Sequence, residues 1–500
     1  MPGVVDKLIR PAIKTRQWEL VVLLAAALLY ALLWGQSYLG FLNDDVDYLM
    51  AARSLWHGRY AWLYYPGQPP QTHFLPGFSF FLMPFAALGM SSWGALRAIP
   101  IVLTLLSGLG IAALGERWGL SRRERVAAMA LFLFNPSAVL ASGIVASEPC
   151  FIAFVLLVLL SADGLLDRPR PDWRVWLMGA LVGWISLMRP EGVALIAAWG
   201  VLGLFSRWRP AALRIAALAG AIWLAWLLRN WRLTGHAAHY AQEWSADLSS
   251  FSPSAQLWRQ ARTLFVESAA GMIWGAGLFL SAAVALVAGL LSALGWRRLW
   301  TANRGPSMIL FTVFLGTYLL IHLAWPPVDA RYFLPVLPGL SLMWLAAPGA
   351  PGRAWTRRAA LLGLVMLAST ALCHTGAWAM LVCRGQLPAQ YALPRATFDW
   401  MQARLPVSAL VLTNKEGAVF LYTGRRVCPL PVTDGARELY DQLESRGADY
   451  VVVFPGPTLS DRVGGLWSRA LGIFQTTPGE FRELYRNAVE GTVVYRRLPR

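Results

Sequence analysis

Residues 18–48 read WELVVLLAAALLYALLWGQSYLGFLNDDVDY, and this stretch decides the fold. Its first part, Trp18 to Tyr38, is apolar and long enough to cross a hydrocarbon core of roughly 30 Å as a helix. Basic residues precede it at positions 7, 10, 14 and 16. No small-residue cleavage site follows it, so we expect an uncleaved first span whose basic end lies in the cytoplasm.

Similar apolar runs recur along the 500 residues, of which 57% are hydrophobic and 14% charged, and this balance excludes an ordinary soluble protein. We expect about eleven membrane spans, at about 18–39, 98–115, 126–144, 149–166, 175–188, 191–205, 212–228, 266–294, 307–325, 332–347 and 359–382. Arginine clusters fall in every second loop, as the positive-inside rule requires. The pattern predicts a polytopic α-helical membrane protein, most simply of a bacterial inner membrane, with its C-terminus extracytoplasmic.

The net charge of +17 does not indicate nucleic-acid binding. Its arginines stand in short clusters between spans, and no soluble segment carries a basic stripe with interleaved aromatic residues. The 25 tryptophans fit the interfacial belts of a membrane protein. We therefore expect membrane lipids, and no nucleic acid, around this chain.

The composition changes near Gln386. We predict a transmembrane module over 1–385, with long outer loops at 43–97 and 229–266, and a small extracytoplasmic α/β domain over 386–500. In that domain, 408–413, 450–454 and 491–495 resemble strands, and 395–404 and 436–446 have helical spacing. It shows no glycine-rich phosphate loop or nucleophile elbow, so we assign it no catalysis. Cys383 and Cys428 are either a disulfide or two unpaired thiols.

The acidic run Asn43-Asp44-Asp45-Val46-Asp47-Tyr48 follows the first span. Carboxylates beside a low-dielectric medium are costly unless they are used or paired, so the run indicates a functional site; the alternative is an ordinary wet loop start. The same loop continues with Tyr65 and with His73 before a Pro-Gly turn. His73 is suited to hold a phosphate or a sugar, or is simply a hydrogen-bonded loop residue.

Three further charged residues are predicted at the same membrane face. Glu148 begins the fourth span, where it serves either chemistry or the helix N-terminus. Arg189 and Arg331 stand on the side that the positive-inside rule leaves poor in basic residues, so each needs an anionic partner. A lipid phosphate bound bidentately is one such partner. An internal pair is the other, with Glu191 for Arg189 or with Asp329 for Arg331.

His236, His239 and Glu243 are spaced three and four residues apart. On a helix they share one face and have side chains that ligate metals. An amphipathic helix lying on the membrane explains the same segment equally well. A divalent metal ion is therefore a possible cofactor that the spacing does not decide.

Taken together, these residues resemble the GT-C glycosyltransferases, in particular the group containing protein O-mannosyltransferases and lipid A aminoarabinose transferases. The resemblance covers roughly residues 18–347. Its matching positions are Asp44, Asp45 and Tyr48 after the first span, His73 before Pro-Gly, Glu148 at the fourth span, and Arg331, Tyr332, Pro335 and Pro338 near the tenth. The family usually has Asp-Glu at the acidic pair and often Lys at the position of His73.

The resemblance implies a polyprenyl-phosphate-linked sugar donor, a glycan, lipid or protein acceptor, and inverting transfer at the outer face. Asp44 would be the general base, and Asp45 or Glu148 would orient the acceptor. Arg331, Arg189 and His73 would neutralise the departing lipid phosphate. Tyr48, Tyr65 and Tyr332 would contact the sugar or the acceptor. Some members of the family use a carboxylate-bound divalent ion.

A membrane transporter, or a flippase for lipid-linked glycans, is the alternative to an enzyme. Such proteins place ionisable groups near mid-membrane and often contain internal repeats. The predicted spans are nearly free of Asp, Glu and Lys at their centres, and the two halves of the chain do not echo one another. A non-catalytic scaffold would leave the acidic, aromatic first loop unexplained.

Overall fold

The structure is a computed structural model that describes residues 17–88, 93–167, 173–237, 252–270, 278–324, 329–388, 391–430, 436–455, 472–474 and 479–498. The chain forms two compact units. The helical unit contains residues 1–34 and 97–380, and the loop–sheet unit contains residues 35–96 and 381–500. The first long loop therefore groups with the C-terminal residues in this division.

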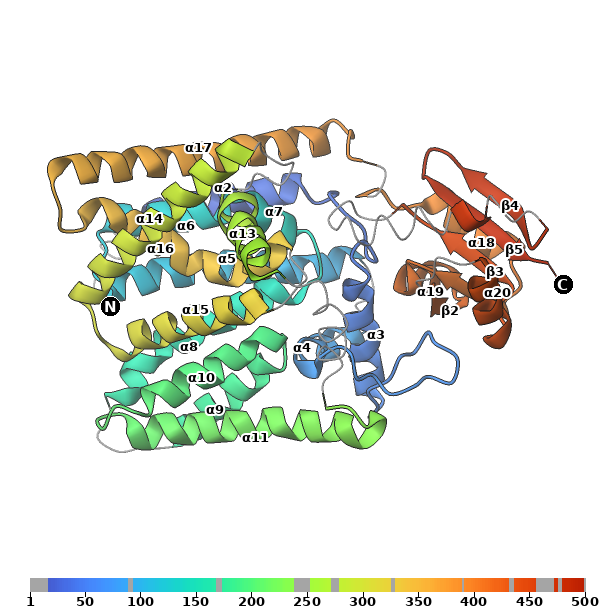
Figure 1. Ribbon diagram of the computed structural model, residues 1–500, viewed down its shortest axis with the longest axis horizontal. Coiled ribbons are helices and arrows are strands. Elements are labelled where there is room, and N and C mark those ends of the chain that lie inside the picture. The colour runs from blue at the N-terminus through green and yellow to red at the C-terminus, as the bar shows by residue number, and fades with distance from the viewer. Residues whose placement is uncertain are drawn as a thin grey trace, which may run out of the picture. The chain divides into compact units, whose positions relative to one another are not determined.

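The helical unit is built from long apolar helices that run side by side (Figure 1). Its α-helices are α2 (Gln17–Leu32), α5 (Trp93–Arg117), α6 (Arg122–Leu133), α7 (Pro136–Ser142), α8 (Ser147–Leu166), α9 (Trp173–Ser186), α10 (Val193–Leu202), α11 (Arg209–Thr234), α13 (Pro253–Arg262), α14 (Leu278–Ala302), α15 (Pro306–Ala324), α16 (Leu337–Ala346) and α17 (Ala354–Cys383). Short 3₁₀ or π segments are η1 (Pro190–Gly192), η3 (Thr263–Ala269), η4 (Ala330–Val336) and η5 (Ala347–Gly349).

Within the described residues, seven helical segments are long and apolar enough to cross a membrane, or eight if the bent pair of α6 and α7 is one span. Shorter apolar helices lie at further predicted spans. Helix α2 has 16 residues and α9 has 14, and Pro190–Leu202 is also short. Within the predicted span 266–294, η3 ends at Ala269 and α14 begins at Leu278.

Prolines account for two of the breaks. Pro136 follows Asn135, whose side chain caps α7 by accepting from the Ser137 amide, and α6 and α7 meet there at an angle of 59°. Pro190 stands between α9 and α10 and disfavours helical geometry at the preceding Arg189, which is extended with φ −147°. The second break leaves the Arg189 side chain at a helix junction.

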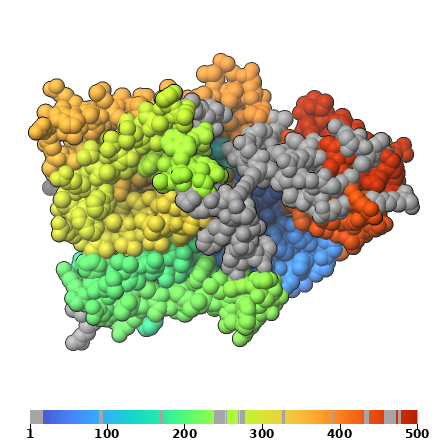
Figure 2. Space-filling view, viewed as in Figure 1, coloured from blue at the N-terminus to red at the C-terminus, as the bar shows by residue number. Residues whose placement is uncertain are grey.

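Helices α11, α14 and α17 expose much of their apolar surface. Only 28% of the apolar window of each is buried, compared with 78% for Ala330–Gly349 at the centre. Figure 2 shows α17 in orange, α14 and α15 in yellow tones and α11 in green across the visible face. Exposed leucines of this number fit a lipid environment.

The loop–sheet unit contains a five-stranded sheet in the order β2-β1-β3-β5-β4. Its strands are β1 (Leu410–Thr413), β2 (Arg426–Pro429), β3 (Tyr450–Val453), β4 (Phe481–Asn487) and β5 (Thr492–Arg497), and its helices in this part are α18 (Arg395–Arg404), α19 (Glu416–Thr423) and α20 (Ala436–Ser445). Strand β1 pairs in parallel with β2 and β3, and β5 is antiparallel to β3 and β4. The three predicted strands and both predicted helices of this region are present.

The first long loop completes the same unit. It forms α3 (Asp44–Trp56) and α4 (Pro76–Ala87), which pack against each other. Between α3 and α4 the chain turns back on itself, and Ala61 and Pro70 form an isolated antiparallel β-bridge. The Val427 amide of β2 donates to the Tyr64 carbonyl at 3.1 Å. The loop thereby satisfies a backbone donor at the edge of the sheet.

Candidate functional site

The acidic run forms the first turn of α3, where carboxylates interact favourably with the helix N-terminus. Its three aspartates differ in environment. Asp45 is fully buried and accepts hydrogen bonds from the amides of Gly40, at 2.7 Å, and Val46, at 3.0 Å. Asp47 is buried and accepts from the Tyr64 hydroxyl. Asp44 is half-buried, and is the most exposed carboxylate of the run.

Burial changes the acid–base behaviour of this run. It raises the pKa of Asp45 to about 6 and raises the pKa of Asp47 well above its usual range. The half-buried Glu416, at the start of α19, has a pKa raised by burial to about 7. Burial lowers the pKa of Lys415 to about 8. The acidic run thus belongs to a larger cluster of ionisable groups that includes the turn before α19.

The other predicted residues of the loop lie among aromatic rings. Tyr48 is buried, with ring centroids 5.1 Å from Phe74 and 5.0 Å from Phe78. Tyr65 is half-buried beside Trp62 and Tyr64.

His73 is half-buried as well, and its backbone amide donates to Gln71 Oε1 at 2.9 Å. The side chains of Tyr65 and His73 are therefore partly exposed, whereas Tyr48 packs in the core of the loop.

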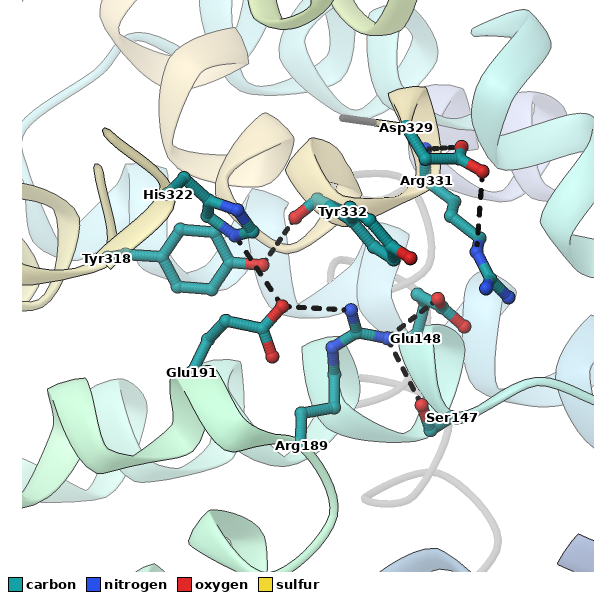
Figure 3. A network of polar contacts seen from close by, with 9 residues as sticks. All are labelled: Ser147, Glu148, Arg189, Glu191, Tyr318, His322, Asp329, Arg331 and Tyr332. Atoms are coloured by element: carbon teal, nitrogen blue, oxygen red, sulfur yellow. Dashed lines mark hydrogen bonds and ion pairs between the residues drawn. The ribbon is translucent and has the colours of Figure 1, made fainter. Parts of the chain in front are cut away.

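A second cluster lies in the helical unit around Arg189 (Figure 3). Arg189 Nη1 is 2.6 Å from Glu148 Oε1 in the first turn of α8, and it also donates to Ser147 Oγ at 3.2 Å. Arg189 Nη2 donates to Glu191 Oε1 at 3.1 Å. The internal pair with Glu191 that the sequence left open is therefore present, and Glu148 joins it.

Aromatic residues and a histidine close this cluster. His322 Nε2, on α15, is 3.5 Å from Glu191 Oε1, and the Tyr318 hydroxyl donates to the Tyr332 carbonyl. The Tyr332 ring lies between two guanidinium groups, with its centroid 5.8 Å from Arg189 Cζ and 5.3 Å from Arg331 Cζ. Figure 3 shows Tyr332 standing between the two arginines.

Arg331 makes the second internal pair that the sequence left open. Asp329 accepts from the Arg331 amide at 2.9 Å, and its other oxygen is 3.6 Å from Arg331 Nε. Both side chains are only partly buried. Arg331 is therefore the more accessible of the two predicted phosphate-binding arginines, since Arg189 is enclosed by carboxylates.

The metal candidates receive no support from the described part of the chain. His236 is exposed just beyond α11, and His239 and Glu243 lie outside the described residues. Among the described residues, no three His, Cys, Asp or Glu side chains converge as a metal site. Cys383 and Cys428, both described, are separate thiols and not a disulfide.

The predicted site residues thus form two clusters, one in each unit. Asp44, Asp45, Tyr48, Tyr65 and His73 belong to the loop–sheet unit, and Glu148, Arg189, Arg331 and Tyr332 to the helical unit. Their convergence on one cavity stays a prediction.

Sequence reasoning missed several members of these clusters. Lys415 and Glu416 were overlooked because the C-terminal domain was assigned no catalysis. His322 carried a usable signal, since an ionisable residue within an apolar span is a functional candidate by position alone. The contact of Glu191 with His322 could not be found from sequence, because the two residues lie on separate elements.

Comparison of the sequence with protein-family models gives no match, and comparison with curated proteins gives none either. Solved structures do match. The structure of ArnT from Cupriavidus metallidurans bound to undecaprenyl phosphate superimposes with a TM-score of 0.59 at 13% identity, covering 96% of this chain and 98% of that one. The chain has the GT-C fold.

A second match with the GT-C fold is the archaeal oligosaccharyltransferase AglB from Archaeoglobus fulgidus, in complex with an inhibitory peptide and a dolichol-phosphate. It has a TM-score of 0.53 at 12% identity, and the match covers 88% of this chain and 70% of AglB. The match to ArnT spans nearly the whole of both chains, so the loop–sheet unit belongs to the shared architecture. The GT-C fold confirms the predicted fold class.

Proposed function

We propose that this chain is a membrane glycosyltransferase that transfers a sugar from a polyprenyl-phosphate donor to an acceptor at the extracytoplasmic face. One observation supports it most: in a chain with the GT-C fold, the acidic run forms a helix start with one half-exposed carboxylate, Asp44, beside two buried ones. The similar ArnT and AglB structures contain undecaprenyl phosphate and dolichol-phosphate. The same class of lipid carrier is the donor proposed here.

Asp44 is the general base in this proposal. Its carboxylate removes the proton from the acceptor hydroxyl or amine as that atom attacks the anomeric carbon. The bond from the anomeric carbon to the phosphate oxygen breaks, and polyprenyl phosphate leaves with the electron pair. Asp45 and Asp47 are less suited to this step, because both are buried and already accept hydrogen bonds within their own unit.

The two arginines have different roles in the proposal. Arg331, partly exposed and always charged, binds the departing phosphate, with His73 as a second contact. Arg189 is engaged by Glu148, Ser147 and Glu191, so we assign it the task of fixing Glu148 and the helix junction. Tyr332 and Tyr65 are the aromatic residues placed to contact the sugar or acceptor. We assign no step to a metal ion, since the described residues offer no set of ligands.

The test is sugar transfer by the purified full-length protein. It is incubated in lipid nanodiscs with a panel of polyprenyl-phosphate sugars, and release of free polyprenyl phosphate is measured. Asp44→Asn should abolish release, whereas Asp399→Asn, an exposed aspartate on α18, should not alter it.

Two outcomes contradict the proposal. Transfer at the wild-type rate by Asp44→Asn removes Asp44 from the mechanism. Movement of the intact lipid-linked sugar between leaflets, without cleavage by any preparation, favours the flippase alternative.

A further inference from the structure

Lysine is used in an unusual way in this chain. Lys and Arg together number 44, yet lysine occurs only at positions 7, 14 and 415. Lys415 is 4% exposed, in the turn between β1 and α19. Burying an ammonium group is costly unless partners compensate it, and a chain that otherwise uses arginine has placed a compact three-donor cation here. The partners of Lys415 therefore indicate what it does.

Lys415 holds the backbone immediately before the acidic run. Its ammonium donates to the Phe41 carbonyl and, at 3.5 Å, to the Gly40 carbonyl. The Gly40 amide donates to Asp45 Oδ2 at 2.7 Å. Asp45 and Lys415 thus bind the two polar groups of the same residue, Gly40, from opposite ends of the chain. The Phe41 ring, 5.7 Å from the ammonium, stacks on Tyr391 and covers the contact.

The turn that carries Lys415 is itself fixed to the sheet. Asn414 donates to the Phe454 carbonyl and accepts from the Phe454 amide, both at 2.9 Å, just past the end of β3. The same turn reaches the start of α3, because Asn43 Nδ2 donates to the Asn414 carbonyl at 2.9 Å and to Glu416 Oε2 at 3.5 Å. The sheet therefore connects to the acidic run through one short turn.

Two glycines allow the backbones to approach this closely. A Cβ at Gly40, where φ is +102°, would lie 2.6 Å from the Ala418 Cβ. A Cβ at Gly417 would lie 2.7 Å from the Val46 Cβ. Both distances are shorter than packed carbon atoms tolerate, so each contact requires glycine. The backbone around the acidic run and the backbone of the turn are therefore in direct contact at two places, Gly40 with Ala418 and Gly417 with Val46.

We infer that Lys415 is a positioning residue: through the turn of residues 414–417, the C-terminal sheet fixes the start of α3 and thereby the orientation of Asp44. This inference rests on the proposed function for the role of Asp44. It assigns the C-terminal sheet a task in the chemistry without placing a catalytic group on it. It also explains why the acidic loop and the sheet form one unit.

Electrostatics supports the assignment. Asp45, Glu416 and Asp44 attract the Lys415 ammonium, and the ammonium in turn lowers the pKa of Asp45 against the effect of burial. The remaining titratable groups around Asp45 and Glu416 come from the segment before α3, from α3, from the loop after it, from α19 and from β2: Tyr38, Asp47, Tyr64, Tyr65, Tyr422 and Cys428. Lys415 is the one cation among these groups within the described residues.

The test uses two variants. Lys415→Met keeps a side chain of similar length and removes the charge, and Lys415→Arg keeps the charge. Carboxyl labelling of the full-length protein by an apolar carbodiimide, across pH, is read by mass spectrometry at Asp45. We expect the labelling midpoint to rise by about one pH unit in Lys415→Met and to stay in place in Lys415→Arg. In the transfer assay, the acidic limb of the plot of kcat/KM against pH should move to higher pH in Lys415→Met only. The KM for the lipid donor should stay unchanged.

An unchanged Asp45 midpoint in folded Lys415→Met, or equal losses of transfer at every pH in both variants, would overturn the inference and leave Lys415 a packing residue. Lys415→Gln, which keeps one donor to Phe41, replaces Lys415→Met if that variant does not fold, with the same expected shift. If wild-type protein releases no polyprenyl phosphate but the Asp45 midpoint still moves, the proposed function fails. The control of the acidic run by Lys415 then stands.

Discussion

Arg189 and Glu148 form a buried ion pair, with 2.6 Å between Arg189 Nη1 and Glu148 Oε1 and with both side chains less than a tenth exposed. The same guanidinium binds Glu191 through its other terminal nitrogen. It therefore joins the start of α8 to the proline break between α9 and α10. A single cation compensates two buried carboxylates at this junction.

Arg189→Met should destabilise the protein severely. It leaves Glu148 and Glu191 buried without their cation, a change that typically costs about 3–5 kcal/mol. The matched control is Arg207→Met, because Arg207 pairs with Asp167 at 3.4 Å with both side chains mostly exposed, and such pairs contribute little. Thermal unfolding of the two variants in detergent provides the comparison. Similar unfolding temperatures for both would show that the Arg189 cluster is not a stabilising element.

Arg331→Ala should weaken use of the lipid donor without unfolding the protein. Loss of one preorganised donor to a departing oxyanion costs about 3 kcal/mol, which is roughly a hundredfold in kcat/KM. Arg331→Lys should lose less, since it keeps the charge but not the bidentate geometry. Steady-state kinetics with varied donor measure both. If the variants lower only the unfolding temperature, the pair with Asp329 is structural and the phosphate role is wrong.

Glu416 should make stability depend on pH. Its pKa is raised from the ordinary 4.5 to about 7, so the folded protein binds more protons than the unfolded chain between these values. Its contribution to stability is therefore present below pH 4.5 and is lost as pH rises through 7. Glu416→Gln should raise the unfolding temperature at pH 8 and leave it unchanged at pH 4.5.

The control for this prediction is Glu444→Gln, on the exposed side of α20, where the carboxylate pairs with Arg497. Its unfolding temperature should not rise at pH 8. Differential scanning fluorimetry at both pH values, on the full-length protein, decides the matter. A Glu416→Gln variant that is less stable than wild type at pH 8 would show that the ionised carboxylate is favourable there.

Gly295→Ala should disrupt the packing of α14 on α16. A Cβ at Gly295 would lie 1.7 Å from the Met343 carbonyl oxygen, so the two helices would have to separate. Gly289→Ala, on the same helix, meets nothing within 4 Å and should be neutral or slightly stabilising. Yield and unfolding temperature of the purified variants test this directly. Equal behaviour of the two would mean that the helices pack differently.

Hydrophobic pattern in the sequence correctly predicted individual helices and strands. The apolar runs correspond to helices, and the short Val-rich runs at 410–413 and 450–453 are strands, because hydrophobic periodicity and length decide such elements. Hydropathy alone does not register the bend of 59° between α6 and α7 at Pro136. The start of α3 was taken as loop, although three acidic residues in succession are typical of a helix N-terminus.

The candidate site was predictable only one residue at a time. Charge and position were enough to find Asp44, Glu148, Arg189 and Arg331. The ion pairs of Arg189 with Glu191 and of Arg331 with Asp329 were foreseen as alternatives to phosphate binding. Lys415 was missed, because its partners Gly40 and Phe41 are more than 370 residues away in sequence. Such a contact leaves no periodic or spacing signal in a single chain.

The loop–sheet unit is assembled from two pieces, residues 35–96 and 381–500, with nearly the whole bundle encoded between them. During translation the first piece emerges long before its partner exists. The carbonyls of Gly40 and Phe41 therefore lack the Lys415 ammonium, and the Tyr64 carbonyl lacks the Val427 amide, until the last helix has left the ribosome. Completion of this unit is then a late event in biogenesis. A chain that ends before residue 381 would carry the acidic run without the contacts of Lys415.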